Sequence, residues 1–523
     1  MDRRTFLSGA VASIIAAPAI AQNTRAQTLR FVPQANLTSF DPIWTTATVT
    51  NNHAYYVFDT LFGFDMDLKA QPQMAESYEK LDDGRTWRFK LREGLTFHDG
   101  QAVRSQDCIA SVKRWCQRDT FGQLLAKANP EWKAIDDRTF EVKLPKPFPL
   151  MISALAKADN APFIMPERLA VTDGNKQITE MVGSGPYKFV ASEYNSGSRV
   201  VYEKFAGYKP RSEAPSRNAG GKVGNFNRIE WHVLPDPATA ANALIQGEID
   251  WWERPLVDLM PMLAKSSDVK LEVTDPTGRM GVMRLNHLQE PFNNMAIRQA
   301  VRLATIQEEH MRASRGDDTS TWQTCRNLWP RGTPYYTGEL EDLMPQSLDK
   351  AKAQLKAAGY SGQKVVVINP TDYPDIGPFG QVTADILRRI GMNVELAETD
   401  WGSVIQRRTS RESVDKGGWS IFHTTGGALG WGTPATSDLV HGQGGKGWYG
   451  WWDNPQAEEM SQAWLDAPDA ESQAKIAVVL GRLALDQVAT IPLGQFTIRT
   501  AYRKTLTGML PGSAPYPWGL KRV

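Results

Sequence analysis

The sequence predicts an α/β protein with more than one domain. Its 523 residues exceed what one ordinary hydrophobic core accommodates, so we expect two or three domains. From about residue 348 the pattern alternates between helix and strand: predicted helices 348–358 and 379–390 each end at a glycine and lead into a short apolar run. Such pairs are typical of an α/β domain with a mixed sheet. The chain also closes on a predicted strand through Phe496 and Ile498.

The composition is that of a globular protein with an unusual number of tryptophans. Hydrophobic residues make up 41% and charged residues 22% of the chain, and the net charge is +1. Without a strong overall charge the chain has no global field to attract nucleic acid or an acidic membrane. The 17 tryptophans favour large rigid contact surfaces, in cores or around a ligand.

The first 27 residues read as an export signal. A basic start precedes an apolar run, 7–20, that is too short to span a bilayer. Ala19-Ile20-Ala21 fits the small-x-small cleavage rule, with the cut before Gln22 or later, near Ala26-Gln27. Arg3-Arg4 followed by x-Phe-Leu resembles a twin-arginine signal; an ordinary secretory signal is the alternative. No cysteine stands at the cut, so we expect a mature protein without a lipid anchor, in the periplasm of a diderm bacterium.

The first half of the mature chain mixes strands and capped helices. Residues 86–91 alternate between apolar and polar, as a half-buried strand does. Asp99-Gly100 is a turn dipeptide, and Ser105 is a predicted N-cap for a helix that reaches Cys116. Further predicted elements are strand 29–33, helix 53–62, a loop at 63–76 and strand 140–144.

Glycine and tryptophan mark the turns of the second half. The run 183–189 could be mistaken for a phosphate loop, but it lacks the Gly-Lys-Ser/Thr ending, and Pro186 removes a backbone donor. Strand 248–252 ends on Trp251-Trp252, and alternation predicts that one faces a core and the other a cleft. Strand 419–424 leads into a Gly/Trp loop at 426–432, and helix 471–489 follows.

The cysteines and histidines show no pattern of a metal site or an enzyme. Cys108 and Cys116 lie ~12 Å apart along a predicted helix, so we expect no bond between them and a structural role for both and for Cys325. We find no CxxC motif, no Gly-x-Ser-x-Gly and no His-Glu-x-x-His, and His98-Asp99 reads as a turn. We therefore predict no catalytic residue, no metal and no cofactor.

Several blocks together resemble one protein family. The chain is similar to the family 5 solute-binding proteins of ABC transporters, the dipeptide, oligopeptide and nickel-binding type. The blocks that carry the resemblance, in the family's order, are 86–94 with Phe97-His98-Asp99-Gly100, 183–189, 246–250, Pro291-Phe292-Asn293 with Arg298-Gln299-Ala300, and Ala357-Ala358-Gly359-Tyr360.

The resemblance implies the two-lobed periplasmic binding protein fold of class II type, with an extra subdomain in the first lobe. The lobes would close on a ligand about a two-stranded hinge. The implied divisions are 1–27 signal peptide, 28–60 first part of lobe I, 61–184 accessory subdomain, 185–269 second part of lobe I, 270–490 lobe II, and 491–523 the final strand of lobe I with the C-terminal segment.

One segment departs from the family pattern. Peptide-binding members typically carry an Asp-Tyr-x-Asp-Pro-like segment after the strand that corresponds to 419–424, and an aspartate there holds the peptide's amino group. Here residues 423–431 contain no carboxylate, and the next one is Asp438. The usual ion pair to a free α-amine is therefore missing from this place.

Loops at strand ends of both lobes should face the cleft. Tryptophans can stack on a ligand, and Arg408 can hold a carboxylate in bidentate fashion, although each of these side chains can also be core or solvated. His423 can equally be a hydrogen-bonded wall residue, and the aromatic run 447–452 can be a cleft edge or packing. The predicted ligand-binding residues are Asn36, Trp251, Trp252, Trp401, Arg408, Trp419, Phe422, His423 and Trp431.

The resemblance implies a monomeric receptor that captures a peptide, or a peptide-like or amino-acid-derived compound, and delivers it to the permease subunits of an ABC importer. A hydrolase, or a sensory or chaperone-like binder on the same scaffold, is the alternative. Binding without turnover would distinguish the receptor from the enzyme.

Overall fold

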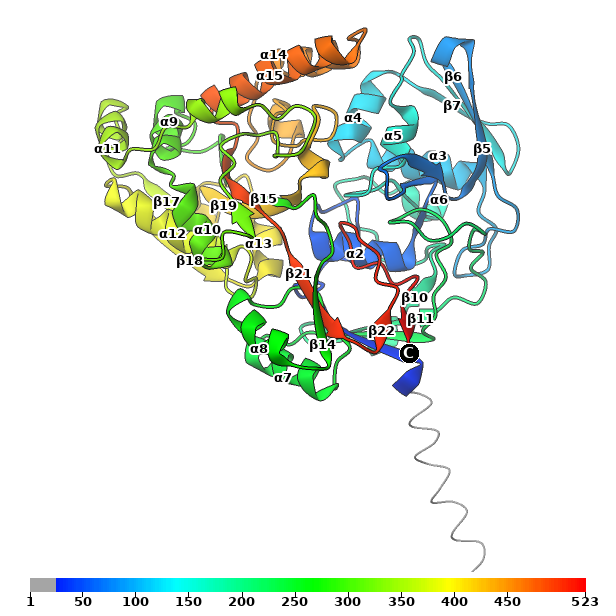
Figure 1. Ribbon diagram of the computed structural model, residues 1–523. Coiled ribbons are helices and arrows are strands. Elements are labelled where there is room, and N and C mark those ends of the chain that lie inside the picture. The colour runs from blue at the N-terminus through cyan, green and yellow to red at the C-terminus, as the bar shows by residue number, and fades with distance from the viewer. Residues whose placement is uncertain (1–24) are drawn as a thin grey trace, which may run out of the picture.

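The computed structural model describes residues 25–523. The predicted signal segment lies outside these residues except for its last three positions. The described chain forms two lobes around two large sheets, with a smaller sheet at the upper right of the view in Figure 1. No helix among residues 25–523 is long and apolar enough to cross a membrane.

Lobe I is organised around a seven-stranded mixed sheet. Its central strand β1 (Thr28–Val32) lies parallel to β12 and β13, while the strands at both edges are antiparallel to their neighbours. The order is β10 (Tyr187–Phe189), β11 (Arg199–Lys204), β12 (Arg228–His232), β1, β13 (Trp251–Trp252), β21 (Arg499–Arg503) and β14 (Val269–Val273); the helices of this lobe are α2 (Thr48–Val57), α7 (Pro237–Gln246) and α8 (Met260–Lys265).

The accessory subdomain is an antiparallel sheet with four helices. Its sheet order is β5 (Ala75–Leu81), β6 (Thr86–Leu91), β8 (Thr139–Lys143) and β7 (Glu131–Ala134). Its helices are α3 (Ser105–Trp115), α4 (Thr120–Lys127), α5 (Met151–Leu155) and α6 (Glu167–Ala170). It also contains the small ladder of β3 (Phe62–Phe64) with β4 (Ala70–Pro72), and the ladder of β2 (Asp59–Thr60) with β9 (Phe163–Ile164) joins it to lobe I.

The Phe97–Gly100 block lies in this subdomain and ties it to the glycine-rich turn. The Nδ1 atom of His98 accepts from the Gly183 amide, and its Nε2 atom lies 3.0 Å from the Gly185 carbonyl. Burial lowers the pKa of His98 to about 4, so a neutral ring that donates from Nε2 fits both contacts. The turn reading of His98-Asp99 agrees with this geometry.

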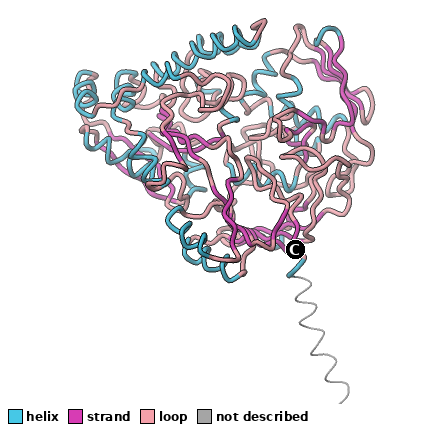
Figure 2. Tube along the Cα trace, in the orientation of Figure 1, coloured by secondary structure: helices cyan, strands magenta, loops and turns pink. Residues whose placement is uncertain are grey.

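Lobe II carries the predicted helix–strand pairs. Its six-stranded sheet has the order β16 (Trp322–Gln323), β20 (Ile491–Phe496), β15 (Arg279–Leu285), β19 (Ile421–Gly427), β17 (Lys364–Pro370) and β18 (Asn393–Thr399). The helices around it are α9 (Met295–Ala304), α10 (Gln307–Arg315), α11 (Leu348–Ala357), α12 (Gly377–Arg389), α13 (Trp401–Arg407), α14 (Pro455–Leu465) and α15 (Ala470–Asp486). Figure 2 shows the strands of the two lobes as separate groups with helices at the outside.

Within residues 25–523 the chain passes between the two large sheets at two points, 274–278 and 497–498. The predicted lobe boundaries at 270 and 490 are therefore displaced. The predicted final strand is in fact two strands: β20 lies in the lobe II sheet and β21 in the lobe I sheet. Thr497-Ile498 contains no glycine or proline, so the sequence carries no turn signal at this crossing.

Several element bounds also differ from the sequence-based expectations. The helix predicted at 53–62 is α2, which begins at Thr48, because its polar first turn is buried rather than solvated. The predicted loop 63–76 contains the β3–β4 ladder. Arg104, not Ser105, is the N-cap of α3, and the Asp107 carboxylate accepts from its amide. The strand predicted at 248–252 is reduced to its two tryptophans.

Candidate functional site

The two lobes enclose a small polar cavity, which we call the inner cavity. It measures about 50 Å³ and is lined by both lobes. Lobe I, with its accessory subdomain, contributes Thr46, Thr48, Asn51, Lys157, Asp159 and Asn160; lobe II contributes Arg279, Thr424, Thr425, Gly426, Gly427, Gly430, Trp431, Thr436, Asp438 and Trp448.

A larger apolar pocket of about 270 Å³ adjoins the inner cavity. The two share Lys157, Asp159, Gly427, Gly430 and Thr436, so they lie side by side. The apolar walls come from the accessory side and from lobe II: Phe64, Leu68, Phe121, Leu150, Leu429, Ala435 and Trp464.

Asp159 is an unpaired carboxylate at the junction of these spaces. Its half-buried side chain has no hydrogen bond or ion pair with any residue in 25–523. A Cβ atom on Gly427 or Gly430 would lie 2.7 or 2.9 Å from its Oδ2 atom, so the lobe II loop approaches this closely only because both residues are glycine. Asp159 is thus available to a cationic group in the cavity.

Arg279 of lobe II supplies a positive charge to the same cavity. One terminal nitrogen donates to the Thr48 hydroxyl at 3.3 Å and to the Thr425 carbonyl at 3.1 Å, and its buried Nε has no partner among the described residues. Burial, together with nearby Arg254, lowers the pKa of Arg279, and the charge of Asp159 acts in the opposite direction. No carboxylate among residues 25–523 forms an ion pair with this guanidinium, which leaves it free to hold one from a ligand.

Two other acidic groups stand beside the inner cavity. Asp119 forms a buried ion pair with Lys157, and Asp438 of lobe II accepts from the Thr120 hydroxyl. Burial raises the pKa of Asp119, and the charge of Asp438 raises it further, against the effect of Lys157. The inner cavity therefore has more carboxylates around it than cations.

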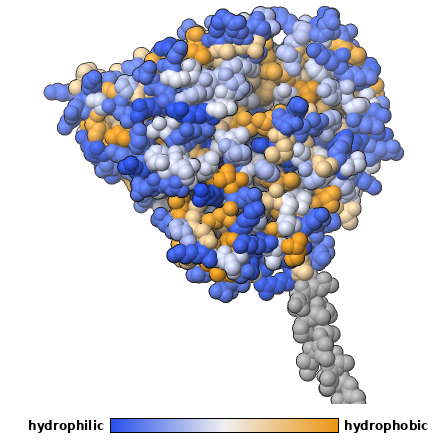
Figure 3. All heavy atoms as spheres, viewed as in Figure 1, coloured by the Kyte–Doolittle hydropathy of each residue, from blue (hydrophilic) through white to orange (hydrophobic). Residues whose placement is uncertain are grey.

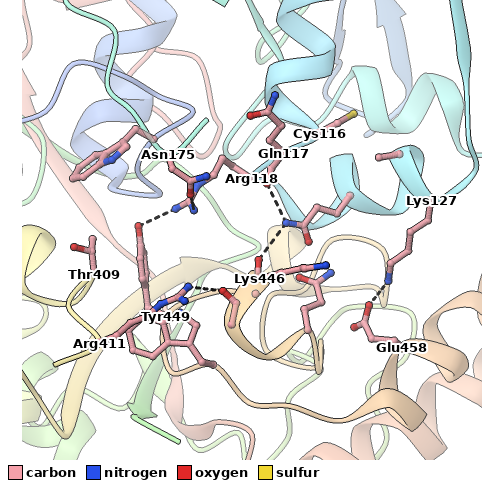
Figure 4. Close-up of a pocket in the computed structure, with 17 residues that line it drawn as sticks. Cys116, Gln117, Arg118, Lys127, Asn175, Thr409, Arg411, Lys446, Tyr449 and Glu458 are labelled. Carbon is pink, nitrogen blue, oxygen red and sulfur yellow. Dashed lines mark hydrogen bonds and ion pairs between the residues drawn. The ribbon is translucent and has the colours of Figure 1, made fainter. Parts of the chain in front are cut away.

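A second space, which we call the outer groove, lies between the accessory subdomain and lobe II. It measures about 1140 Å³, and Figure 4 shows the residues that line it. A small cavity of about 30 Å³, which we call the passage, lies between it and the inner cavity: Trp44, Arg118, Lys446 and Tyr449 line both groove and passage, and Thr46 and Trp448 line both passage and inner cavity. The groove is lined by Trp44, Cys116, Gln117, Arg118, Gln123, Ala126, Lys127, Asn175, Thr409, Arg411, Gln443, Gly445, Lys446, Gly447, Tyr449, Trp451 and Glu458.

Direct contacts join the lobes along this interface. At the hinge side, Arg254 of lobe I donates to Asp375 at 2.8 Å and to the Tyr373 hydroxyl at 2.7 Å. Burial alone would raise the pKa of Asp375, but the charges and hydrogen bonds of Arg315 and Arg254 outweigh it and lower the pKa to about 2. At the groove, Lys127 pairs with Glu458. The lobes are thus closed on one another at both ends.

The structure places the nine predicted ligand-binding residues in different surroundings. Trp431 lines the inner cavity, and Trp251 lines a cavity of about 40 Å³ at the hinge. Trp252 packs on α7 in a separate core, so the two tryptophans face opposite sides, as strand alternation predicts. The half-buried Asn36 accepts from the Gly197 amide with its side-chain oxygen.

The predicted residues at the ends of the lobe II strands are packed inside that lobe. Trp419 is buried between Phe422 and Trp451 and donates to the Ser410 carbonyl. His423 lies 2.8 Å from the Thr383 hydroxyl of α12. Trp401 packs edge-on against Tyr373, with ring centroids 5.2 Å apart.

Arg408 is a contact between the lobes. Its guanidinium lies 4.7 Å from the Tyr449 ring centroid and donates to the hydroxyls of Thr45 and Thr46 in lobe I, each at 3.3 Å. Burial lowers its pKa, and its Nε has no partner among the described residues. A role in binding a ligand carboxylate therefore remains a prediction for this residue.

Some residues of the aromatic run 447–452 line a cavity, and others pack in the core of lobe II. Trp448 lines the inner cavity and donates to the Thr46 hydroxyl, and Tyr449 and Trp451 line the outer groove. Trp452 is buried in the lobe II core.

Sequence reasoning missed Asp159 and Arg279. Asp159 follows α5 in the turn Lys157-Ala158-Asp159-Asn160, whose sequence gives no signal of a binding site. Arg279 begins β15 directly after Gly278, at the hinge crossing. A charged residue at a predicted hinge strand is the signal that points to it.

The cysteines and acidic clusters suggest no further chemistry. Cys108, Cys116 and Cys325 are buried free thiols, and burial raises the pKa of Cys325 to about 12. Among residues 25–523 no group of three or more histidine, cysteine, aspartate or glutamate side chains is arranged to hold a metal ion.

Comparison with known proteins gives a consistent result. Residues 69–448 match the model of bacterial extracellular solute-binding proteins, family 5 Middle. A probable peptide ABC transporter periplasmic-binding protein of Sinorhizobium fredii is 37% identical over 492 residues, which are 93% of this chain and 92% of the relative. A glutathione-binding protein of Pectobacterium atrosepticum is 28% identical over 434 residues, 81% of this chain and 78% of the relative.

Solved structures agree in fold. The A. tumefacien R10 binding protein AgaA in complex with agropinic acid has a TM-score of 0.80 at 22% identity, covering 95% of this chain and 99% of its own. A dipeptide-binding protein from Pseudoalteromonas sp. SM9913 in complex with Met-Leu has a TM-score of 0.78 at 19% identity, covering 95% and 100%. The two lobes and the accessory subdomain are thus a known architecture.

Proposed function

Because this chain belongs to the bacterial extracellular solute-binding proteins of family 5, the solute-binding components of ABC importers, we propose that it captures a peptide-like solute bearing a free amine and delivers it to the permease subunits. We place it outside the cytoplasmic membrane as a monomeric receptor without catalytic activity. The names of the two relatives, one a probable peptide-binding and one a glutathione-binding protein, support this class of solute.

The observation that carries the proposal is the pair of opposite charges in the inner cavity. Asp159 on one wall and Arg279 on the other have no ion-pair partner among the described residues, and each comes from a different lobe. A zwitterionic solute can place its ammonium at Asp159 and a carboxylate at Arg279, and each hydrogen-bonded ion pair would be shielded from water.

The apolar pocket beside Asp159 adds a side-chain site. Its 270 Å³ would accept an aliphatic or aromatic side chain next to the amine, since Leu429, Phe121 and Trp464 supply its walls. A residue with an apolar side chain and a free amine therefore fits this part of the cleft.

Lobe closure explains how capture would signal to the permease. Asp159 and Arg279 approach one solute only when the lobes are closed, so the solute binds the closed form more tightly and shifts the population toward it. The contacts of Arg254 and Arg408 across the interface stabilise the same closed arrangement. The closed shape is what a permease would recognise.

Calorimetry with short peptides tests this proposal. The panel contains di- to tetrapeptides with an apolar first residue, each with a free and with an acetylated amino terminus. We expect binding of free-amine peptides at least about tenfold tighter than of their acetylated forms, because a charged hydrogen bond contributes roughly 1.5–3 kcal/mol. Mass spectrometry of the recovered peptide should show it unchanged.

Two results would contradict the proposal. Steady conversion of a peptide by the purified protein would make it an enzyme. Equal binding of acetylated and free peptides would remove the amine from the recognition.

A further inference from the structure

The outer groove is strongly basic. Arg118 and Lys127 reach into it from the accessory side, and Arg411 and Lys446 from lobe II (Figure 4). Glu458 is the one acidic residue among the described residues that line it.

The single carboxylate of the groove is already engaged. Glu458 pairs with Lys127 and also accepts from the His441 ring, whose Nδ1 lies 2.8 Å away. Burial alone would raise the pKa of Glu458, but His441 and Lys127 outweigh it and lower the pKa to about 2. Glu458 therefore neutralises its own neighbours and leaves the other three cations uncompensated.

Those three cations have only neutral partners, or none, among residues 25–523. Arg118 donates to the Asn175 side-chain oxygen at 2.8 Å and to the Tyr449 hydroxyl at 3.3 Å. Arg411 donates to the Gly445 carbonyl, and the Lys446 ammonium has no partner there. The groove thus has an unbalanced positive charge.

Aromatic rings form part of the groove wall beneath these charges. The Arg411 guanidinium lies 5.3 Å from the Trp451 ring centroid, and Tyr449 and Trp44 continue the wall toward the passage. Apolar walls around one sign of charge concentrate the field at the groove and strengthen its attraction for an anion.

The groove adjoins the ligand cleft, with the passage between the two. Arg118, Lys446 and Tyr449 line both groove and passage, and Trp448 lines both passage and inner cavity. A chain-like solute held at Asp159 therefore has a route along the passage to Lys446.

We propose that the outer groove is an anion subsite that receives a carboxylate or phosphoryl group at the end of the solute remote from its amine. This rests on the proposed function, since it assigns a charge to the far end of the same solute. The solute class is then an amine-bearing, peptide-like compound with an additional anionic group, rather than a neutral peptide.

The subsite also favours lobe closure. Arg118 belongs to the accessory side, while Arg411 and Lys446 belong to lobe II, so closing brings like charges toward one another. An anion between them replaces this repulsion with attraction and therefore binds the closed form preferentially.

Matched peptides test the subsite through the solute. The probes are the tetrapeptides Leu-Ala-Ala-Glu and Leu-Ala-Ala-Gln with free C-terminal carboxylates, which differ in one charge, titrated by calorimetry at fixed ionic strength. We expect the glutamate peptide to bind about fivefold tighter for each cation it approaches, from Coulomb attraction at ~4 Å in water. In the double variant Arg411→Gln/Lys446→Gln the preference should fall below about twofold, and in the control Lys356→Gln, an exposed lysine elsewhere on lobe II, it should persist.

Simple anions test the groove without a peptide. The probes are citrate and inorganic phosphate, each compared with sodium chloride of equal ionic strength in a thermal shift measurement. We expect each anion to raise the melting temperature of the wild-type protein and of Lys356→Gln above the value in sodium chloride. The melting temperature of Arg411→Gln/Lys446→Gln should not rise. A larger gain with citrate indicates a carboxylate end, and a larger gain with phosphate a phosphoryl end.

The two measurements separate the two proposals. In one outcome, anions stabilise the wild type but not the double variant, and neither protein binds a peptide. This outcome contradicts the peptide-like solute but supports the anion subsite. Peptides that bind the wild type and the double variant with the same charge preference, together with no anion effect on melting, overturn the subsite and leave the proposed function standing.

Discussion

The inner cavity and the outer groove lie along one interface between the lobes but differ in charge and size. The inner cavity is small and flanked by Asp159, Asp438 and Asp119 against Arg279 and Lys157. The outer groove is about twenty times larger and is lined by four cations against one glutamate. Figure 3 shows one face of the molecule, on which hydrophilic residues predominate and apolar residues are scattered in groups.

This difference indicates how one cleft can combine selection with tolerance. A cavity of only 50 Å³ with fixed charges selects one group, because an unmatched polar atom in so small a space loses water without gaining a partner. A larger groove lined by lysines and arginines accepts different shapes that share a charge. The cavity should therefore determine which end of the solute is bound, and the groove which solutes are preferred.

A lower pH should destabilise the packing behind the inner cavity, but it should leave the charge of the outer groove unchanged. Behind β19, Thr383 bridges two buried histidines, with contacts of 3.0 Å to His310 and 2.8 Å to His423. Burial lowers the pKa of His310 to about 4, and burial together with nearby His310 lowers that of His423 well below its usual value. Lysine and arginine stay cationic in this range.

The sign of the pH effect follows from these shifts. Between pH 6.5 and about 4 the unfolded chain binds protons that the folded histidines refuse, so stability is complete above pH 6.5 and falls as the pH decreases. Each histidine should lower the unfolding free energy by up to about 1.4 kcal/mol per pH unit. Urea unfolding across this range measures the slope, and His310→Gln should make it shallower. A free energy that stays constant from pH 7 to 4.5 would contradict the prediction.

Asp159→Asn should cause the largest loss of solute affinity. The substitution keeps the size of the side chain but removes the charge, so free-amine peptides should bind roughly ten- to a hundredfold more weakly, the value of a charged hydrogen bond. Acetylated peptides should bind the variant and the wild type alike, which calorimetry can measure.

The matched control is Asp415→Asn, an exposed aspartate of lobe II in the 3-10 turn 414–416. It removes the same charge away from the cleft, so affinity should be unchanged. If Asp159→Asn bound free-amine peptides as tightly as this control, the inner cavity would not be the amine site.

The fold was predictable largely because its signals are local. Helix–strand pairs after residue 348 and the two faces of Trp251-Trp252 follow from periodicity within a few residues. The two-lobed arrangement with its accessory subdomain was predicted from the family resemblance. The crossing at 497–498 was not predictable, because two strands of different sheets follow one another without a turn residue. Local sequence describes a strand but not the sheet that it joins.

The candidate site was predicted less well for a physical reason. Trp419 and Phe422 look like ligand-binding residues, yet an aromatic at a strand end has the same pattern whether it faces a core or a cleft. Asp159 gains its role from glycines almost 270 positions later in the chain, and only the folded arrangement brings the three together. Unpaired charge at an interface is a property of the tertiary structure.

Gly427→Ala should narrow the inner cavity without disturbing its strand. Gly427 does not adopt a positive φ, so alanine is compatible with its backbone, but the new Cβ would lie 2.7 Å from Asp159 Oδ2. The carboxylate must then move, and we expect affinity for free-amine peptides to fall about tenfold, the equivalent of ~1.4 kcal/mol. Gly338→Ala, whose Cβ would meet no atom within 4 Å, is the control and should bind normally. Equal affinity of both variants would show that the glycine approach is irrelevant to binding.

Lys127→Gln should have the smallest effect on the preference for an anionic peptide. It tests whether the paired cation of the groove matters less than the unpaired ones. Lys127 is exposed and already pairs with Glu458, which keeps its contact with His441 after the substitution. An exposed ion pair contributes roughly 0–1 kcal/mol, so the preference for an anionic peptide should change less than about threefold. Lys446→Gln, which removes an ammonium that has no partner among residues 25–523, should reduce that preference more. Calorimetry of both variants with the same peptide pair decides the order; a larger loss in Lys127→Gln would mean that the paired, not the unpaired, cations attract the solute.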